Sequence, residues 1–228
     1  NTGALNPEYF KTLSSNDDLE GVKNIYMNIG WTFPAISDDM VFDLISHVNG
    51  GGNLFLAGQD VAWDITQNGG TPIAQNFLRT LLRANYIDDG NASNNPVTPI
   101  ADELFADFDA FSLFEYYGAG LFYPDQLMPM NGGIGCLSYD GTNKIAAVNF
   151  DSGTSKTVYL GFGVEMIQDE SVQADIMKRV YDYFNGTVDN EEIDALNAMI
   201  QVFPNPASNG ELNIEVQGSL QGGLDLQL

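Results

Sequence analysis

The chain has 228 residues, a length that accommodates one domain of ordinary size and a further fragment. Its hydrophobic fraction of 44% is normal for a globular core, and its 8 basic and 31 acidic residues give a formal net charge of −23. Such a surface repels phosphate backbones and anionic lipids, which excludes nucleic-acid binding. No apolar stretch reaches the roughly 18 residues of a membrane span, so we expect no membrane insertion.

The first third of the chain alternates strand and helix patterns. Ser37 is predicted to be a helix N-cap. Asp38 and Asp39 follow it and would lie in the first turn of the helix, where carboxylates interact favourably with the helix dipole. Pro72 fits the first position of another helix. The predicted elements are a short helix over 7–16, a strand over 22–29, a helix over 38–48, a strand over 53–57 and a helix from Thr71 to Leu82.

The pattern changes after residue 86. Residues 87–130 are rich in Asn, Asp, Pro and aromatic residues, and we interpret them as an irregular insertion whose aromatic side chains pack as a small core or form a binding platform. Three strands are then predicted, separated by short turn signals, so an antiparallel edge should form after residue 134. These later elements are strands over 135–139, 144–150 and 157–162, a helix over 170–184 and an acidic linker over 187–199.

This order of strands and capped helices predicts an α/β domain with a mostly parallel sheet and an antiparallel edge. In open parallel sheets, ligands bind beyond the carboxyl ends of the strands. The carboxylates, amides and Trp side chains expected there could hold a glycan, a peptide or a calcium ion, or could instead cap the backbone and fill the core. The candidate ligand residues are Asn28, Trp31, Gln59, Asp60, Trp63 and Glu165. No catalytic residue and no other cofactor is predicted.

The C-terminal part carries a separate motif. The run from Val202 to Leu212 contains Phe203, Pro204, Asn205 and Pro206, and alternating apolar strands are predicted over 212–216 and 224–228. This run resembles the start of the C-terminal sorting domain of Bacteroidetes proteins that use type IX (Por) secretion. The resemblance implies a secreted or cell-surface protein that contacts the type IX machinery. Two strands are too few for an independent sheet, so we interpret 201–228 as the truncated start of a β-sandwich.

The region before the linker resembles the class I glutamine amidotransferase-like superfamily, which has a three-layer, flavodoxin-like fold. The segment from Gly51 to Asp60 is similar to the strand and sharp turn that place the nucleophilic cysteine in that family. The segment from Leu160 to Glu165 is similar to its last strand and Phe-His-Pro-Glu motif. The resemblance implies an amidotransferase-like domain over residues 1–186, a linker over 187–200 and the sorting segment over 201–228.

The residues that amidotransferase chemistry needs are missing from this sequence. The expected turn contains Ala57, Gly58 and Gln59 instead of cysteine, and Gly163 stands where the family has histidine. The single histidine, His47, is predicted to complement a helix dipole, and the single cysteine, Cys136, to be a buried and inert thiol. Glutaminase activity is therefore rejected.

Three functions remain open at this point. The favoured one is a non-catalytic accessory or binding domain of a secreted protein. The first alternative is a hydrolase, a peptidase or glycosidase, that uses carboxylates at the strand edge such as Asp60 and Glu165. The second is a structural spacer beside an upstream catalytic module. Because no signal peptide opens the chain, we expect it to begin after processing or inside a longer polypeptide.

Overall fold

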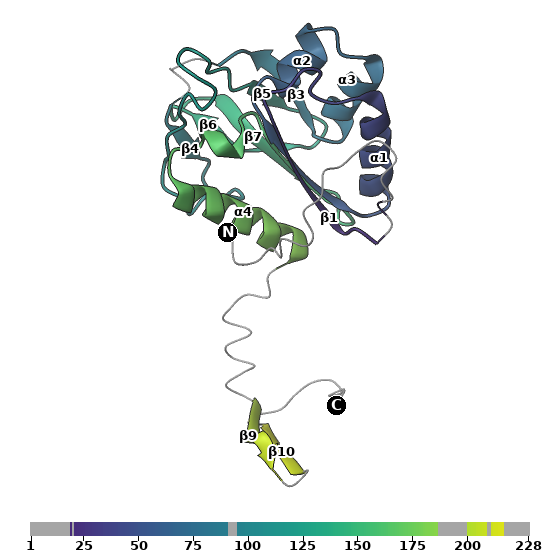
Figure 1. Ribbon diagram of the computed structural model, residues 1–228, viewed down its shortest axis with the longest axis vertical. Coiled ribbons are helices and arrows are strands. Elements are labelled where there is room, and N and C mark those ends of the chain that lie inside the picture. Colours follow the sequence, from purple (N-terminus) through teal and green to yellow (C-terminus); the bar gives the residue numbers. More distant parts are fainter. Residues whose placement is uncertain (1–18, 20, 91–94, 187–199, 209–210, 217–228) are drawn as a thin grey trace. The chain divides into compact units, whose positions relative to one another are not determined.

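The computed structural model describes residue 19, residues 21–90 and 95–186, and the backbone of two strands at 200–208 and 211–216 (Figure 1). The chain divides into two compact units, with the boundary between Phe184 and Asn185. The helix predicted over 7–16 and the linker predicted over 187–199 lie outside the described residues.

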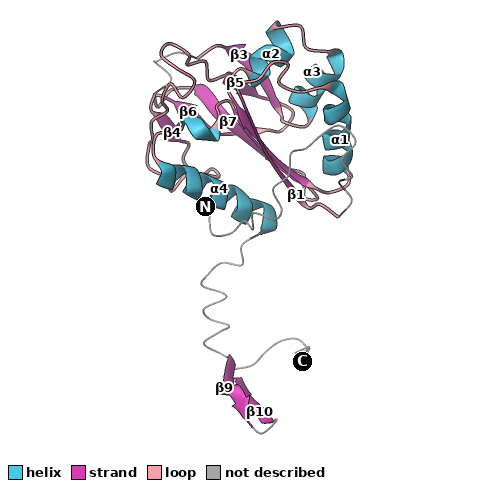
Figure 2. Ribbon diagram, in the orientation of Figure 1, coloured by secondary structure: helices cyan, strands magenta, loops and turns pink. Residues whose placement is uncertain are grey.

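An eight-stranded mixed sheet forms the centre of the first unit (Figure 2). The main strand order is β1-β2-β8-β7-β5-β3, while β6 pairs with β7 and with β4. The pairs β1–β2 and β2–β8 are parallel, and the other pairs are antiparallel. The strands are β1 (Asn24–Gly30), β2 (Asn53–Gly58), β3 (Ala84–Asp88), β4 (Val97–Pro99), β5 (Gln126–Pro129), β6 (Ile134–Tyr139), β7 (Lys144–Asp151) and β8 (Lys156–Leu160).

The predicted α/β class is confirmed, since β1, β2, β5, β6 and β8 run in one direction and β3, β4 and β7 in the other. The antiparallel part begins earlier in the chain than predicted. Residues 87–130, expected to be irregular, contain all of β4 and β5 and the end of β3. These strands are short and their pairing partners are distant, so local residue patterns did not reveal them.

Helices cover both faces of the sheet, which gives three layers (Figures 1 and 2). One core packs under α1 (Asp38–Asn49), α2 (Val61–Gln67) and α3 (Pro72–Thr80), and includes Leu54 and Leu56 of β2. The other packs under α4 (Glu170–Asn185) and includes Phe55 and Ala57. Because both faces of β2 are covered, its apolar run is continuous. A short 3₁₀ helix, η3 (Val164–Met166), follows β8.

The predicted caps explain where two helices begin. The Ser37 side chain accepts a hydrogen bond from the Met40 backbone N–H at the start of α1, and Thr71 accepts one from Ala74 at the start of α3. Each bond satisfies a backbone donor that has no partner within the helix. The sequence did not predict α2, whose seven residues are too few for a clear helical repeat.

Aromatic residues of the 87–130 segment divide between the two roles considered for them. Phe105, Phe111 and Phe122 are buried and belong to the core under α4. Phe114 and Tyr116 are exposed, at 41% and 53% of their accessible surface. The expected small core is therefore present, and part of the segment remains available at the surface.

In the second unit, β9 (Ile200–Ser208) pairs with β10 (Glu211–Val216) in an antiparallel hairpin. The Pro-Asn-Pro sequence lies within β9. The register is irregular between the Phe203–Asn213 and Ser208–Glu211 pairs, and this interval contains both prolines. A bulge is a physically suitable place for proline, which has no N–H to donate. The strand predicted over 224–228 lies outside the described residues.

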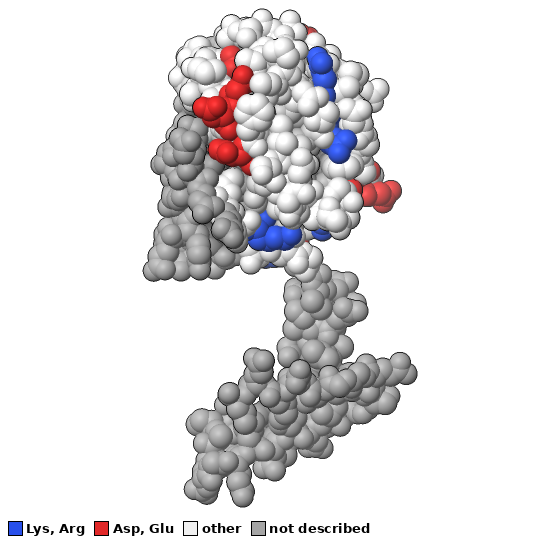
Figure 3. All heavy atoms as spheres, turned by 90° about the vertical axis from the view of Figure 1, so that its right-hand side faces the viewer, with Lys and Arg blue, Asp and Glu red and all other residues white. Residues whose placement is uncertain are grey.

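On the face shown in Figure 3, one group of Asp and Glu side chains lies on one side of the first unit, and another acidic patch lies on the opposite side. Among the described residues, no helix has the length and apolar character needed to cross a membrane.

Candidate functional site

The sharp turn between β2 and α2 lies at the carboxyl end of the parallel strands. Backbone bonds fix it from both sides, since Gly58 N donates to Phe162 O at 3.1 Å and Gln59 N donates to Gly30 O at 3.0 Å. Gly58 is the last residue of β2, so the turn consists of Gln59 and Asp60 and is shifted from the predicted Ala57-Gly58-Gln59. Asp60 adopts a left-handed backbone with φ of 59°, which is uncommon for residues other than Gly, Asn and Asp.

Asp60 is buried and is held by one aromatic side chain. Trp31 donates from Nε1 to Asp60 Oδ2 at 2.6 Å, whereas Asp60 Oδ1 has no hydrogen-bond partner. Burial raises the pKa of Asp60 to about 7, the Trp31 hydrogen bond opposes this shift, and the nearby carboxylates of Asp89 and Asp64 add to it.

Glu165 follows β8 and closes the same edge of the sheet. Its carboxylate accepts hydrogen bonds from Asn28 Nδ2, at 2.5 Å, and from the Tyr117 hydroxyl. Asn28 in turn accepts from Val164 N at 3.3 Å. A Cβ atom added to Gly163 would lie only 2.0 Å from Glu165 Oε1. The Glu165 carboxylate therefore occupies the space in which a side chain at position 163 would begin.

Aromatic rings extend over this edge in an unbroken series of contacts. Trp31 lies 5.5 Å from Tyr117, 6.0 Å from Tyr123 and 6.1 Å from Phe33 between ring centroids, and Phe33 lies 5.8 Å from Trp63. Tyr117 continues the series through Tyr116 to Phe114, at 5.2 Å and 5.8 Å. The aromatic surface comprises Trp31, Phe33, Trp63, Phe114, Tyr116, Tyr117 and Tyr123.

The six candidate ligand residues thus lie near one another in small groups at one edge of the sheet. Asn28 bonds to Glu165, and Trp31 bonds to Asp60. Gln59 is buried, and its Oε1 accepts from the Tyr123 backbone N–H at 3.0 Å, so its carbonyl oxygen supports the backbone. Trp63 is half-buried and joins the series through Phe33.

Two further carboxylates that the sequence did not single out meet Asp60. Asp89 follows β3 and Asp125 precedes β5, and one carboxylate oxygen of each lies within 4.8 Å of the corresponding atoms of the other two. We call Asp60, Asp89 and Asp125 the carboxylate cluster. Burial raises the pKa of Asp89, and burial raises the pKa of Asp125 well above its ordinary value.

Asp125 is fully buried and also stabilises the start of α2. Its Oδ2 accepts from Ala62 N at 2.7 Å and from the Tyr159 hydroxyl at 3.3 Å, and its Oδ1 accepts from Trp63 N at 3.2 Å. A seven-residue helix is unstable alone, so an acceptor from a distant part of the chain is important for α2.

His47 and Cys136 lie away from the sharp turn. His47 Nε2 is 3.2 Å from Asn53 O, at the start of β2, whereas the turn follows the end of that strand. Cys136 is fully buried in β6, and burial raises the pKa of its thiol. Neither side chain can form a nucleophile and base pair at the turn.

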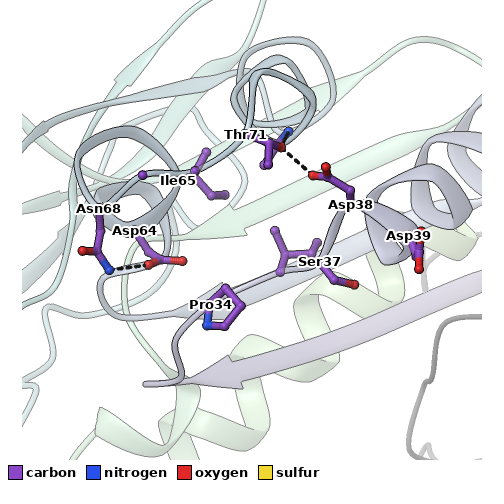
Figure 4. Close-up of a pocket in the computed structure, with 12 residues that line it drawn as sticks. Pro34, Ser37, Asp38, Asp39, Asp64, Ile65, Asn68 and Thr71 are labelled. Carbon is purple, nitrogen blue, oxygen red and sulfur yellow. Dashed lines mark hydrogen bonds between the residues drawn. The ribbon is translucent and has the colours of Figure 1, made fainter.

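A separate pocket of about 330 Å³ lies between the start of α1 and the α2–α3 loop (Figure 4). Its polar side chains are mainly bonded to protein groups. Asp64 accepts from Ala35 N at 2.7 Å and from Asn68 Nδ2 at 2.9 Å, and Thr71 donates to Asp38 at 2.5 Å. We therefore regard the pocket as a structural junction, and none of the candidate ligand residues lines it.

No family model and no curated protein sequence matches the chain. Solved structures match its fold. A β-galactosidase from the Antarctic haloarchaeon Halorubrum lacusprofundi matches at 17% identity, 76% coverage of this chain, 23% of that chain and a TM-score of 0.52. A cold-adapted β-galactosidase from Rahnella sp. R3 matches at 11% identity, with 76% coverage of this chain, 24% coverage of that chain and a TM-score of 0.50. The chain spans about a quarter of each enzyme, and identities this low establish similarity of fold alone.

Proposed function

We propose that the α/β unit is a non-catalytic accessory domain that binds neutral glycans, within a secreted protein exported by type IX secretion to the cell surface. The observation that carries the binding role is the aromatic surface at the carboxyl edge of the parallel strands. Phe33, Phe114 and Tyr116 are each more than 40% exposed there, although large aromatic side chains are normally buried.

The chemistry of this surface suits a sugar. Aromatic rings offer flat apolar faces, and hydrogen-bonding groups lie beside them in Asn28 and Glu165. The net charge of −23 opposes phosphorylated or sulfated ligands, so a neutral glycan is favoured. The matched β-galactosidases contain this fold in about a quarter of their length, which supports its use as one part of a larger chain.

We propose a non-catalytic role because of the residues at and around the sharp turn between β2 and α2. Asp60 occupies the left-handed position, and no histidine lies near it to act as a base. Both oxygens of Glu165 accept hydrogen bonds, and one oxygen of Asp60 accepts a hydrogen bond from Trp31, so three of these four carboxylate oxygens are engaged by the protein. These contacts favour binding over the hydrolase alternative, and the exposed rings favour binding over the spacer.

A glycan array followed by affinity electrophoresis in neutral polysaccharides tests the binding role. Phe33→Ala and Tyr116→Ala remove exposed rings from the aromatic surface and should weaken binding about tenfold or more. Phe42→Ala is the matched control, because Phe42 is 54% exposed on α1 and outside the surface. Binding that is unchanged by the first two substitutions would refute a role for this surface.

The export part of the proposal rests on the sequence motif around Phe203 to Pro206. In the natural protein, removal of the chain from residue 201 onward should retain it in the periplasm, as measured by cell fractionation. A truncated protein that reached the cell surface as efficiently as the intact one would contradict type IX export through this segment.

A further inference from the structure

The carboxylate cluster brings together three segments that are distant in the sequence. Asp60 belongs to the β2–α2 turn, Asp89 follows β3 and Asp125 precedes β5. Their ligand atoms lie within 4.8 Å of one another. Asp60 and Asp125 are 6% and 0% exposed, so these charges are removed from bulk water. Like charges this close repel strongly in such surroundings and need neutralisation.

In the described part of the chain, no basic side chain forms an ion pair with the carboxylate cluster. Among the residues that the structure describes, the ion pairs of Lys and Arg are made with Asp151, Asp182 and Asp107. None of these acids belongs to the carboxylate cluster. A buried group of like charges without a cationic partner is unfavourable for the fold unless a proton or a cation joins it.

A second observation points to a missing ligand. Asp60 is more than nine-tenths buried, yet no N–H or hydroxyl group donates to its Oδ1, and none donates to the buried Oδ1 of Asp89. The two carboxyl groups can bond to each other only when one of them carries a proton. Buried oxygens in native proteins nearly always accept a bond, so two orphaned oxygens in one cluster need an explanation. The other oxygen of Asp60 is fixed by Trp31, and Asp125 is fixed by two backbone N–H groups, so two of the three carboxylates are held in place.

We propose that Asp60, Asp89 and Asp125 bind a divalent cation, with calcium as the favoured ion. All three ligands are carboxylate oxygens, which suit hard cations. Two oxygens on one ion can be separated by at most twice the metal–oxygen distance, about 4.6–5.2 Å for calcium and about 4.2 Å for magnesium. Ligand atoms that all lie within 4.8 Å of one another can therefore reach one calcium ion together. Asp89 is partly exposed, so water can complete the coordination from that side.

Such an ion would have a defined structural effect. Asp89 and Asp125 lie at the two ends of the segment that contains residues 90–124, and Asp60 lies in the sharp turn. A shared cation would hold both ends of this segment against the turn. The segment carries Phe114, Tyr116 and Tyr117, but the cation site does not depend on what the aromatic surface binds.

Terbium luminescence and calcium-dependent thermal unfolding of the metal-free protein test this site. The Trp31 indole bonds directly to Asp60, so it should sensitise the emission of a bound terbium ion. Calcium should displace terbium more effectively than magnesium does. One millimolar calcium should also raise the unfolding temperature of the wild type, because a ligand that binds only the folded state stabilises it.

Two charge-neutral variants one residue apart separate the cluster from the general acidic surface. Asp89→Asn removes one ligand and should weaken calcium binding about tenfold or more, because affinity depends on ligand charge. Asp88→Asn removes the same charge from an exposed neighbour and should bind like the wild type. Asp60→Asn should also abolish the calcium effect, and Asn tolerates the left-handed backbone.

Three results would overturn the proposal. The first is a wild type without any calcium-dependent shift, which would leave shared protons as the means of neutralisation. The second is equal binding by Asp89→Asn and Asp88→Asn, which would place the ion elsewhere. The third is stronger competition by magnesium than by calcium, which would reject the calcium assignment.

Discussion

Trp31 Nε1 donates a hydrogen bond to Asp60 Oδ2 at 2.6 Å, and this bond joins the end of β1 to the sharp turn after β2. Trp31 belongs to the aromatic surface and Asp60 to the carboxylate cluster, so the two candidate binding features share one contact. A substitution of Trp31 or of Asp60 should therefore alter both the aromatic surface and the carboxylate cluster.

Substitution of Trp31 with Phe should destabilise the protein by about 1–3 kcal/mol. An aromatic ring is kept, but the buried Asp60 carboxylate loses its hydrogen-bond donor. Urea unfolding measures the loss. Trp63→Phe is the control, because it changes another Trp of the aromatic surface without removing the Trp31–Asp60 bond. Equal losses in the two variants would show that ring size, and not the hydrogen bond, is responsible.

Asp125→Ala should cost about 2–4 kcal/mol of stability. The substitution leaves Ala62 N, Trp63 N and the Tyr159 hydroxyl without their buried acceptor. Asp109→Ala removes an exposed aspartate of the same segment and should change stability by less than about 0.5 kcal/mol. Chemical denaturation of both variants measures the difference, and similar values for the two would contradict the capping role of Asp125.

His47 should make stability sensitive to mild acid. Burial lowers the pKa of His47, a backbone hydrogen bond to Asn53 opposes this shift, and the charge of Lys23 adds to it. The unfolded chain therefore binds this proton near pH 6.5, where the folded protein does not. The stability that neutral His47 contributes is therefore fully present above about pH 6.5. It is lost as the pH falls below that value, by at most about 1.4 kcal/mol per pH unit.

The measurement compares the free energy of unfolding at pH 7.5 and pH 5.5 for the wild type and His47→Gln. Glutamine can still donate to Asn53 O but does not titrate, so the variant should lose less stability on acidification. A parallel loss in both proteins would assign the pH dependence to other groups.

Gly161→Ala and Gly163→Ala should differ in their effect on folding. A Cβ at position 161 would lie 2.4 Å from the Asp125 backbone oxygen, and that backbone cannot move without disturbing the sheet. A Cβ at position 163 would meet the end of the Glu165 side chain, which can rotate away. Thermal unfolding should show a larger loss for the first variant than for the second, which loses only the bonds of Glu165 to Asn28 and Tyr117. The reverse order would be incompatible with this packing.

Much of the fold could be predicted because its signals are local. Ser37 and Thr71 mark helix starts, and the continuous apolar run from Leu54 to Ala57 indicates a strand covered on both faces. The carboxyl edge of the parallel strands followed from these elements. The prediction that residues after these strands meet at this edge correctly placed Asp60 near Trp31 and Asn28 near Glu165.

The rest depends on contacts between distant residues. Asp125 is separated by 63 positions from Ala62, its backbone partner, and in the sequence it is one acid among many in a loop-like segment. Asp89 has the same charge as its exposed neighbour Asp88, so local pattern could not distinguish them. The pairing of β3 with β5 brings Asp89 near Asp125, and the bonds from Ala62 and Trp63 to Asp125 bring both beside the turn.

The position of the Glu165 carboxylate limits how an enzyme could be designed on this scaffold. A cysteine at position 60 and a histidine at position 163 would restore the residue types of an activated thiol, but the histidine Cβ would collide with Glu165. Glu165 would have to leave Asn28 and Tyr117, which would then need new partners. Installing hydrolytic activity therefore requires a concerted redesign of the residues around Glu165, and two substitutions alone should yield a folded but inactive protein.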